Sequence, residues 1–419
     1  MNTLQKQIHT LTTAAKEAGY ILAAEPAEQI NHALEAMAKA LDTHRKEIQD
    51  ENKKDLAAGK KRGLSAAMID RLTLSDTVID SMISGVETIK NLPTPIGQRY
   101  EEKNLENGLR LSKMKVPIGV VGIIYESRPN VTVDAAAICL KSNNAVILRG
   151  GSEAFYSNTI LARIFSDVLR DTGLPEKAVQ LIDTTDRQAV NYLLKESSTV
   201  DLIIPRGGEK LIETVVEHSH IPVIKHYKGV CHLYIAPSAS PETARAIAIN
   251  GKTQRPGVCN ALETILIHRD VPEAVKKDII SALIQEGVCI RGDAAIQTLS
   301  DDVEPAGEED WDREYLDLIV TMGEVSSTDA AIAHINRHGS GHTEAIVTAD
   351  TDEMAAFQLR VDASSVMVNA STRFADGGEY GMGCEIGIST DKLHARGPMG
   401  VDDLTTYKWL VEGEGQVRE

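Results

Sequence analysis

Three patterns of hydrophobic and polar positions follow one another along the chain. Up to residue 92 the apolar positions repeat at intervals of three, four and seven, as on one face of a helix. The repeating positions include Ile30, Leu34, Met37, Leu41 and Ile48. From 108 to 117 apolar and polar residues alternate, which predicts an exposed or edge strand. Beyond Ile118 short apolar runs alternate with helical stretches, and this is typical of a parallel sheet covered on both faces.

Two successive sets of strands are predicted, with a domain boundary near 226–230. The first set is 118–124, 145–148, 179–182, 202–204 and 222–224, with helices at 153–170, 186–196 and 208–218. The second set is 232–235, 264–267, 288–290, 318–321, 345–348 and 366–368. The expected fold class is therefore α/β, with two doubly wound, Rossmann-like parallel sheets. Such sheets bind ligands at the carboxyl ends of their strands, so we expect a site in a cleft between the two domains.

The C-terminal segment 405–413 alternates again and can pair with residues 109–116. A two-stranded unit of this kind is marginally stable alone, and its unpaired edges attract a partner strand. We therefore expect an oligomerisation arm and a homo-oligomer, either dimer or tetramer.

Composition narrows the partners and the compartment. The 419 residues carry a net charge of −17, from 44 basic and 61 acidic residues, without a long basic run, so neither nucleic acid nor a membrane surface is an expected partner. The five cysteines are odd in number and contain no CxxC pair, and the twelve histidines show no HExxH spacing. The cysteine pattern and the lack of a recognisable signal peptide at the start predict a cytoplasmic protein. The cysteine and histidine spacings predict no metal site.

Cys259 is the candidate nucleophile. It lies between a predicted helix at 241–252 and the strand at 264–267, on a connection of the kind that displays catalytic groups. A thiolate can form a thioester and divide an acyl transfer into two easier steps. The alternative is a small buried hydrophobe, since a cysteine outside disulfides is among the most buried residue types. The other four cysteines are expected to be structural.

The glycine motifs do not carry the common dinucleotide fingerprint. No strand is followed by GxGxxG, and the similar motif at 381–387 precedes no convincing helix. The segments 149–153 and 205–208 each join a strand to a helix and contain an arginine, so they could bind phosphate at a helix N-terminus. The alternative for both is a simple capped turn, with Ser152 as the cap of the first.

Several segments in order resemble the aldehyde dehydrogenase superfamily, and within it the branch that reduces an acyl phosphate. They are 116–130, 148–153, 205–208, 226–229, 254–259, 338–345 and 371–387. The resemblance implies an NADP-binding domain at 1–107 and 120–226, and a catalytic domain at 227–370. It also implies an oligomerisation arm at 108–119 and 400–419, with a substrate-site loop and return segment at 371–399. Members of the superfamily bind the dinucleotide without GxGxxG.

The resemblance also implies roles for individual residues. Cys259 matches the nucleophile, and the side-chain amide of Asn130 matches the donor that completes an oxyanion hole with the Cys259 backbone N–H. The residues expected to bind the cofactor NADPH/NADP are Arg149, Ser152, Glu153, Arg206, Gly207 and Glu314. Because the segment 149–153 contains an extra glycine, its residues do not by themselves indicate NADP rather than NAD. The preference for NADP is implied by the resemblance alone.

One departure from the superfamily bears on the reaction. Enzymes that produce free acids carry a water-activating glutamate where this chain has Tyr227-Lys-Gly-Val-Cys231. Glu263 could replace it, but we interpret Glu263 as a structural residue. A missing base favours phosphate chemistry, in which the thioester is formed from an acyl phosphate.

The reaction implied is the NADPH-dependent reduction of L-glutamate 5-phosphate to L-glutamate 5-semialdehyde and phosphate, in proline biosynthesis. The cations expected near the leaving phosphate are His226, Lys228, Arg255 and Arg373, although a surface ion pair accounts for each of them equally well. The 371–387 segment either closes over the glutamyl end or is a structural crossover loop. Transient contact with glutamate 5-kinase is a possible partnership.

Two other functions compete with this one. The first is a general NAD(P)-dependent aldehyde dehydrogenase that makes carboxylic acids, and the missing base counts against it. The second is a non-catalytic partner that channels the product of a glutamate kinase, and the presence of both Cys259 and Asn130 counts against that.

Overall fold

The computed structural model describes residues 1–418 and divides them into two compact units. The first unit contains residues 1–225, 381–387 and the chain from 399 onward, and the second contains 226–380 and 388–398. The segment 371–399, expected as one substrate-site element, is thus divided between the units. None of the helices within residues 1–418 is both long and apolar enough to cross a membrane.

Five helices open the first unit, as the apolar periodicity predicts. They are α1 (Thr3–Leu22), α2 (Ala27–Thr43), α3 (Arg45–Lys61), α4 (Ala66–Leu72) and α5 (Asp76–Asn91). Their apolar face is buried, since Ile30, Leu34 and Met37 are at most 1% exposed. Asn2, Ser65 and Ser75 each cap a helix by accepting a backbone N–H, which explains where α1, α4 and α5 begin.

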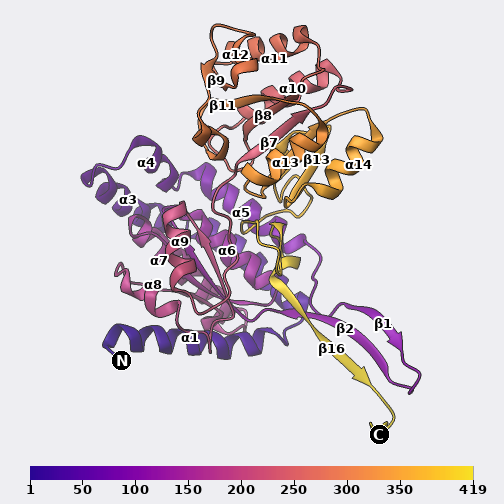
Figure 1. Ribbon diagram of the computed structural model, residues 1–419. Helices are drawn as coiled ribbons and strands as arrows, with labels where there is room; N and C mark the ends of the chain where they lie inside the picture. Colours follow the sequence, from indigo (N-terminus) through magenta and orange to yellow (C-terminus); the bar gives the residue numbers. More distant parts are fainter. Residues whose placement is uncertain (419) are drawn as a thin grey trace. The chain divides into compact units, whose positions relative to one another are not determined.

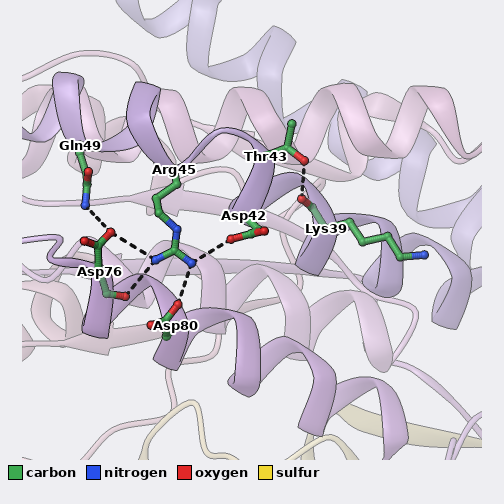
Figure 2. Close-up of polar contacts among 7 residues, drawn as sticks. All are labelled: Lys39, Asp42, Thr43, Arg45, Gln49, Asp76 and Asp80. Atoms are coloured by element: carbon green, nitrogen blue, oxygen red, sulfur yellow. Dashed lines mark hydrogen bonds and ion pairs between the residues drawn. The ribbon is translucent and has the colours of Figure 1, made fainter.

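Arg45, the first residue of α3, connects three of these helices at the surface. Figure 2 shows its guanidinium between Asp42 of α2 and Asp76 and Asp80 of α5. The nitrogen–oxygen distances are 2.9 Å to Asp42 and 2.6 Å to Asp80. Gln49, one turn further along α3, donates to Asp76 at 2.9 Å. Exposed ion pairs of this kind contribute little each to stability, so the buried apolar stripes, more than Arg45, hold the helices together.

The first unit contains a parallel sheet in the order β5-β4-β3-β6. The strands are β3 (Val120–Tyr125), β4 (Ala145–Arg149), β5 (Val179–Leu181) and β6 (Leu202–Arg206). The helices between them are α6 (Asn130–Lys141), α7 (Phe155–Asp171), α8 (Gln188–Leu193) and α9 (Glu209–His218). Short 3₁₀ turns lie at Ser152–Ala154 and Glu176–Ala178. The predicted strand 222–224 is wrong, because this segment makes a single bridge, between Val223 and Ile203.

A three-stranded antiparallel sheet, β1-β2-β16, forms an arm of the first unit (Figure 1). The strands are β1 (Arg99–Asn104), β2 (Arg110–Pro117) and β16 (Thr405–Glu412), and the last 3₁₀ turn, Asp402–Leu404, leads into β16. Pairing runs from Thr405 opposite Pro117 to Glu412 opposite Arg110, which confirms the predicted partnership of the two segments. The third strand, β1, was not predicted.

The second unit contains a parallel sheet in the order β10-β9-β11-β8-β7-β12-β13. The strands are β7 (Cys231–Ile235), β8 (Leu262–His268), β9 (Cys289–Gly292), β10 (Glu304–Pro305), β11 (Ile319–Val325), β12 (Thr343–Val347) and β13 (Ser365–Val368). The helices are α10 (Pro241–Thr253), α11 (Glu273–Gln285), α12 (Ala294–Gln297), α13 (Thr328–His338) and α14 (Thr351–Arg360). A small pair, β14 (Ile388–Ser389) with β15 (Gly397–Pro398), and 3₁₀ turns at Glu308–Asp312 and Thr372–Phe374 complete the unit. The α/β class with two parallel sheets and an arm is confirmed.

Candidate active site

Cys259 lies in the loop between α10 and β8 of the second unit, as predicted. Its side chain is partly exposed, whereas Cys139 and Cys231 are buried. None of the five cysteines, all within the described residues 1–418, takes part in a disulfide. The partial exposure argues against the alternative of a sealed core residue and leaves the sulfur able to meet a substrate.

The backbone of Cys259 packs directly against Gly229. A Cβ placed on Gly229 would lie 1.8 Å from the carbonyl oxygen of Cys259, so only glycine fits there. The thiol of Cys231 donates to the same oxygen at 3.2 Å. Burial raises the pKa of Cys231 well above its ordinary value, so this thiol keeps its proton and remains a donor. Gly229, just before β7, and the side chain of Cys231, its first residue, therefore both contact the main chain of the nucleophile loop.

Arg373, one of the predicted cations, interacts electrostatically with a second, Arg255, and with Cys259. Burial first, and then the charge of Arg255, lower the pKa of Arg373, while Asp376 and Cys259 oppose this change. Arg373 is therefore close enough to Arg255 and to Cys259 for their charges to act on it, because the interaction of charges falls with distance. The Nε of Arg373 also donates to Gln254 at 2.8 Å, which joins this arginine to the start of the loop. Positive charge next to a thiol favours its ionised form.

The other two predicted cations bind backbone carbonyls. The Nδ1 atom of His226 is 2.8 Å from the carbonyl oxygen of Ile388, and the Nζ of Lys228 donates to that of Asp312 at 2.8 Å. The His226 ring also packs edge-on against His342, at 5.8 Å between ring centroids. Burial and the neighbouring His226 lower the pKa of His342 to about 3, so His342 is neutral. His226 and Lys228 are thus anchored within the second unit.

Glu314 connects to the nucleophile through Gly229. Its carboxylate accepts the backbone N–H of Gly229 at 2.8 Å, next to the point where Gly229 meets Cys259. The expected nicotinamide-ribose residue and the candidate nucleophile are therefore joined by one short stretch of main chain. Its role with the cofactor stays a prediction.

Asn130 is the first residue of α6 in the first unit. Its Nδ2 donates to Oδ2 of Asp134, one turn further along the helix, at 3.2 Å. Burial raises the pKa of Asp134 to about 6, against the opposing effects of Asn130 and Arg206. Asp134 orients the amide of Asn130, and sequence reasoning missed it, although the spacing of four residues on a helix was a usable signal.

Asp134 predicts a pH dependence of stability. The pKa in the folded chain, about 6, exceeds the ordinary 3.8, so the folded chain binds this proton more tightly than the unfolded chain. The cost of ionising it is absent below pH 4 and complete above pH 6. An Asp134→Asn variant should therefore be more stable than the wild type at pH 8, by about 2–3 kcal/mol at about 1.4 kcal/mol per pKa unit. Urea unfolding should show this gain vanishing at pH 4, and an equal gain at both pH values would contradict the assignment.

The predicted cofactor loop 149–153 surrounds a small pocket. Arg149, Gly151, Ser152 and Thr184 are among its lining residues. Arg149 is 7% exposed, its Nη1 donates to the carbonyl of Gly150, and its Nε has no hydrogen-bond partner among residues 1–418. Glu153 accepts from Ser127 at 2.9 Å and from Ser152 at 3.3 Å. A buried donor without a partner beside a pocket fits an anionic ligand.

Carboxylates already occupy the two helix N-termini that were expected to bind phosphate. Asp55 of α3 accepts the backbone N–H groups of Tyr156 and Ser157 at the start of α7, at 3.2 and 2.8 Å. Glu126 accepts the N–H of Gly208 before α9 at 3.1 Å. The expectation that Ser152 caps the first helix is wrong, because its hydroxyl donates to Glu153 and Asp55 takes the capping position from another helix.

Arg206 ends β6 and Gly207 follows it, and the two residues lie against two other segments of the first unit. A Cβ on Gly207 would meet the Glu126 side chain at 2.7 Å, which explains the glycine. The Arg206 guanidinium lies beside Gly387, where an added Cβ would be 3.1 Å from its Nη1. The structure thus brings Arg206 and Gly207 near Glu126, and their contact with a dinucleotide stays a prediction. No cluster of metal-ligating side chains is found in residues 1–418.

Comparisons with known proteins identify the family of this chain. The model of the aldehyde dehydrogenase family matches residues 2–288. A protein of Geobacter metallireducens named gamma-glutamyl phosphate reductase is 51% identical over the full length of both chains, and a namesake from Moorella thermoacetica is 50% identical over 99% of each. The crystal structure of gamma-glutamyl phosphate reductase from Thermotoga maritima superimposes with a TM-score of 0.97 at 42% identity, covering 98% of this chain and 100% of that one. The chain therefore belongs to the aldehyde dehydrogenase family, and is an oxidoreductase of the group formed by these relatives.

Proposed function

We propose that this oxidoreductase uses NADPH to reduce L-glutamate 5-phosphate to L-glutamate 5-semialdehyde and phosphate, a step of proline biosynthesis. The names of the full-length relatives support this reaction. The observation that carries it is the partly exposed Cys259 close to Arg373, whose charge interacts in turn with that of Arg255. A thiolate needs an activated acyl group to attack, and the two guanidinium groups suit a phosphate leaving group.

In the first step, the Cys259 thiolate attacks the γ-acyl carbon of the substrate. The bond between that carbon and the phosphate oxygen breaks, leaving a thioester on Cys259 and inorganic phosphate. Arg255 and Arg373 stabilise the charge that develops on the departing phosphate, because guanidinium groups pair with phosphate through parallel hydrogen bonds. His226 and Lys228 contribute positive charge from further along the same unit.

In the second step, the Asn130 amide and the Cys259 backbone N–H stabilise the oxyanion that forms when the thioester is reduced. One such donor typically contributes about 3–4 kcal/mol to the transition state. NADPH supplies the hydride when it is bound. The thiohemiacetal then collapses to the aldehyde, and Cys259 recovers its thiolate.

The segment 227–231 favours this reaction over the production of free acids. Members of the superfamily that produce free acids carry a water-activating glutamate in this segment, whereas here it reads Tyr-Lys-Gly-Val-Cys and contains no carboxylate. Water therefore lacks a carboxylate base in this segment, and the thioester persists until it is reduced. The missing base favours acyl phosphate reduction over a general aldehyde dehydrogenase, and the partly exposed Cys259 argues against a non-catalytic channelling partner.

The residues that would hold NADPH are Arg149, Ser152, Glu153, Arg206, Gly207 and Glu314. The buried Nε of Arg149 beside the pocket fits the negative charge of a dinucleotide phosphate. Phosphate binding at α7 or α9 by backbone N–H groups would require Asp55 or Glu126 to give up its hydrogen bonds. A cytoplasmic location, assembly through the β1-β2-β16 arm and transient contact with glutamate 5-kinase belong to the same proposal.

The reverse reaction gives the sharpest test, because it requires three substrates. We expect the wild type to oxidise glutamate semialdehyde with NADP only when inorganic phosphate is present, and Cys259→Ala to be inactive. Absorbance of NADPH at saturating aldehyde measures this, with NAD in place of NADP as a parallel arm. Turnover without phosphate would instead indicate a general aldehyde dehydrogenase, and unchanged turnover in the variant would reject the thioester.

A further inference from the structure

A fully buried ion pair joins two residues that flank the nucleophile loop in the sequence. Lys252, in the last turn of α10, donates to Oε2 of Glu263, the second residue of β8, at 2.9 Å. Both side chains are 0% exposed. The eight residues between Thr253 and Leu262 include Cys259, so the pair joins the segment that enters the loop to the segment that leaves it.

Packing alone does not account for such a pair. Burial raises the pKa of Glu263 and lowers that of Lys252, so each side chain bears a cost for its charge that the other offsets. Two apolar side chains of similar size would fill the same space without this cost. The best physical reason for such a buried ion pair is that it fixes the surrounding chain in one geometry.

Glu263 extends this geometry to a second segment. Its other oxygen, Oε1, accepts the backbone N–H of Leu316 at 3.3 Å, and Tyr315 makes a further backbone hydrogen bond to the same carboxylate. Leu316 has a φ of 55°, in the left-handed region that a branched side chain rarely adopts. The carboxylate therefore holds the 315–316 backbone in a conformation that it would not adopt alone.

The held segment leads back to the nucleophile. Glu314, immediately before Tyr315, accepts the N–H of Gly229, and Gly229 lies against the carbonyl of Cys259. A continuous series of contacts thus connects Lys252 with Cys259. It passes through Glu263, the 314–316 backbone and Gly229. Every member belongs to the second unit.

We propose that Lys252 and Glu263 are positioning residues that fix the main chain of Cys259 relative to Glu314. The proposal rests on the proposed function only in taking Cys259 as the nucleophile. Glu263 is not a catalytic base, since it is fully buried and both its oxygens are engaged. Its other charged or ionisable neighbours are Cys231 and, near Lys252, Asp317. Losing the pair would let the loop move, and a displacement of about 1 Å at a reacting atom can cost a hundredfold in rate.

The test compares Glu263→Gln and Lys252→Met with a matched control from the same unit. Gln keeps the shape of Glu263 and an oxygen for Leu316, while losing the charge that binds Lys252. Lys276→Met is the control, because Lys276 of α11 pairs with Glu324 of β11 at 2.6 Å in the same unit, with the lysine side chain 6% and the glutamate side chain 29% exposed. We measure kcat and KM, the rate of Cys259 alkylation by iodoacetamide across pH, and the melting temperature.

We expect both variants to fold, with kcat lowered about 10- to 100-fold, KM within about twofold, and the alkylation profile of Cys259 altered. Lys276→Met should change the melting temperature alone, and Lys252→Arg should restore part of the rate. Wild-type kcat and alkylation in folded Glu263→Gln would overturn the proposal, as would equal losses in Lys276→Met. If the wild type lacks reductase activity, the proposed function fails, while the alkylation profile still decides whether the pair positions Cys259.

Discussion

Replacing Cys259 with serine is expected to lower kcat by about a thousandfold or more while leaving the fold intact. A serine hydroxyl is not ionised at neutral pH, whereas a thiol ionises far more readily and its thiolate is the nucleophile. The two side chains are nearly equal in size, and Cys259 is partly exposed, so packing should hardly change. Steady-state reduction of L-glutamate 5-phosphate measures the loss, and circular dichroism checks the fold.

Cys289→Ser is the matched control for this substitution. Cys289 is also partly exposed, but it lies on β9, and burial raises its pKa. We expect this variant to keep its activity within about twofold. A Cys259→Ser enzyme with more than a tenth of wild-type kcat would show that the thiol does not carry the acyl group.

Gly229→Ala should be nearly as damaging, although it adds only a methyl group. The added carbon would lie 1.8 Å from the Cys259 carbonyl oxygen and 2.7 Å from its Cα, so the nucleophile loop must move. Such overpacking typically costs about 1–3 kcal/mol of folding free energy, and moving a nucleophile by about 1 Å can cost a hundredfold in rate. We expect kcat to fall by at least about a hundredfold, together with a lower urea midpoint of unfolding.

Gly307→Ala offers a comparison within the same unit. A methyl group there would meet the Asp310 carboxylate at 3.7 Å, an ordinary van der Waals contact, and this glycine has a negative φ of −90°. This variant should retain its activity and most of its stability. If Gly229→Ala behaved like Gly307→Ala, the close contact between Gly229 and Cys259 would be absent from the working enzyme.

The parallel sheets were predictable because central strands such as β3, β7 and β8 are buried on both faces. Apolar runs such as 120–125 and 265–267 are typical of buried parallel strands when helical stretches alternate with them. The polar strand β1, Arg99–Asn104, escaped prediction because five of its six residues are exposed and its place depends on pairing with β2. A strand defined by its partner leaves little trace in its own side chains. The predicted strand 222–224 shows the converse, because this segment is apolar and yet forms only a single β-bridge.

Local sequence located Cys259, because a helix, a short loop and an apolar strand are all visible around it. Local sequence could not reveal that Gly229 contacts Cys259. Nor could it reveal that Asp55 and Glu126 bind the starts of α7 and α9, since these contacts join segments 30 to 102 positions apart. Ser152 illustrates the limit well, because a serine before a helix predicts a cap, and only the structure shows a carboxylate from α3 in that place. Asp134 was within reach, as the i+4 neighbour of Asn130.

The arm has a consequence for biosynthesis on the ribosome. Strand β2 is synthesised early, but its partner β16 begins with Thr405, which pairs with Pro117, 288 positions earlier in the chain. At about 5–20 residues per second, the nascent chain carries one bare edge of β2 for roughly 15–60 s, while the entire second sheet emerges and folds. Translation must therefore be almost finished before this strand gains its second neighbour, and messages truncated shortly before codon 405 should yield chains that recruit chaperones or aggregate through that edge.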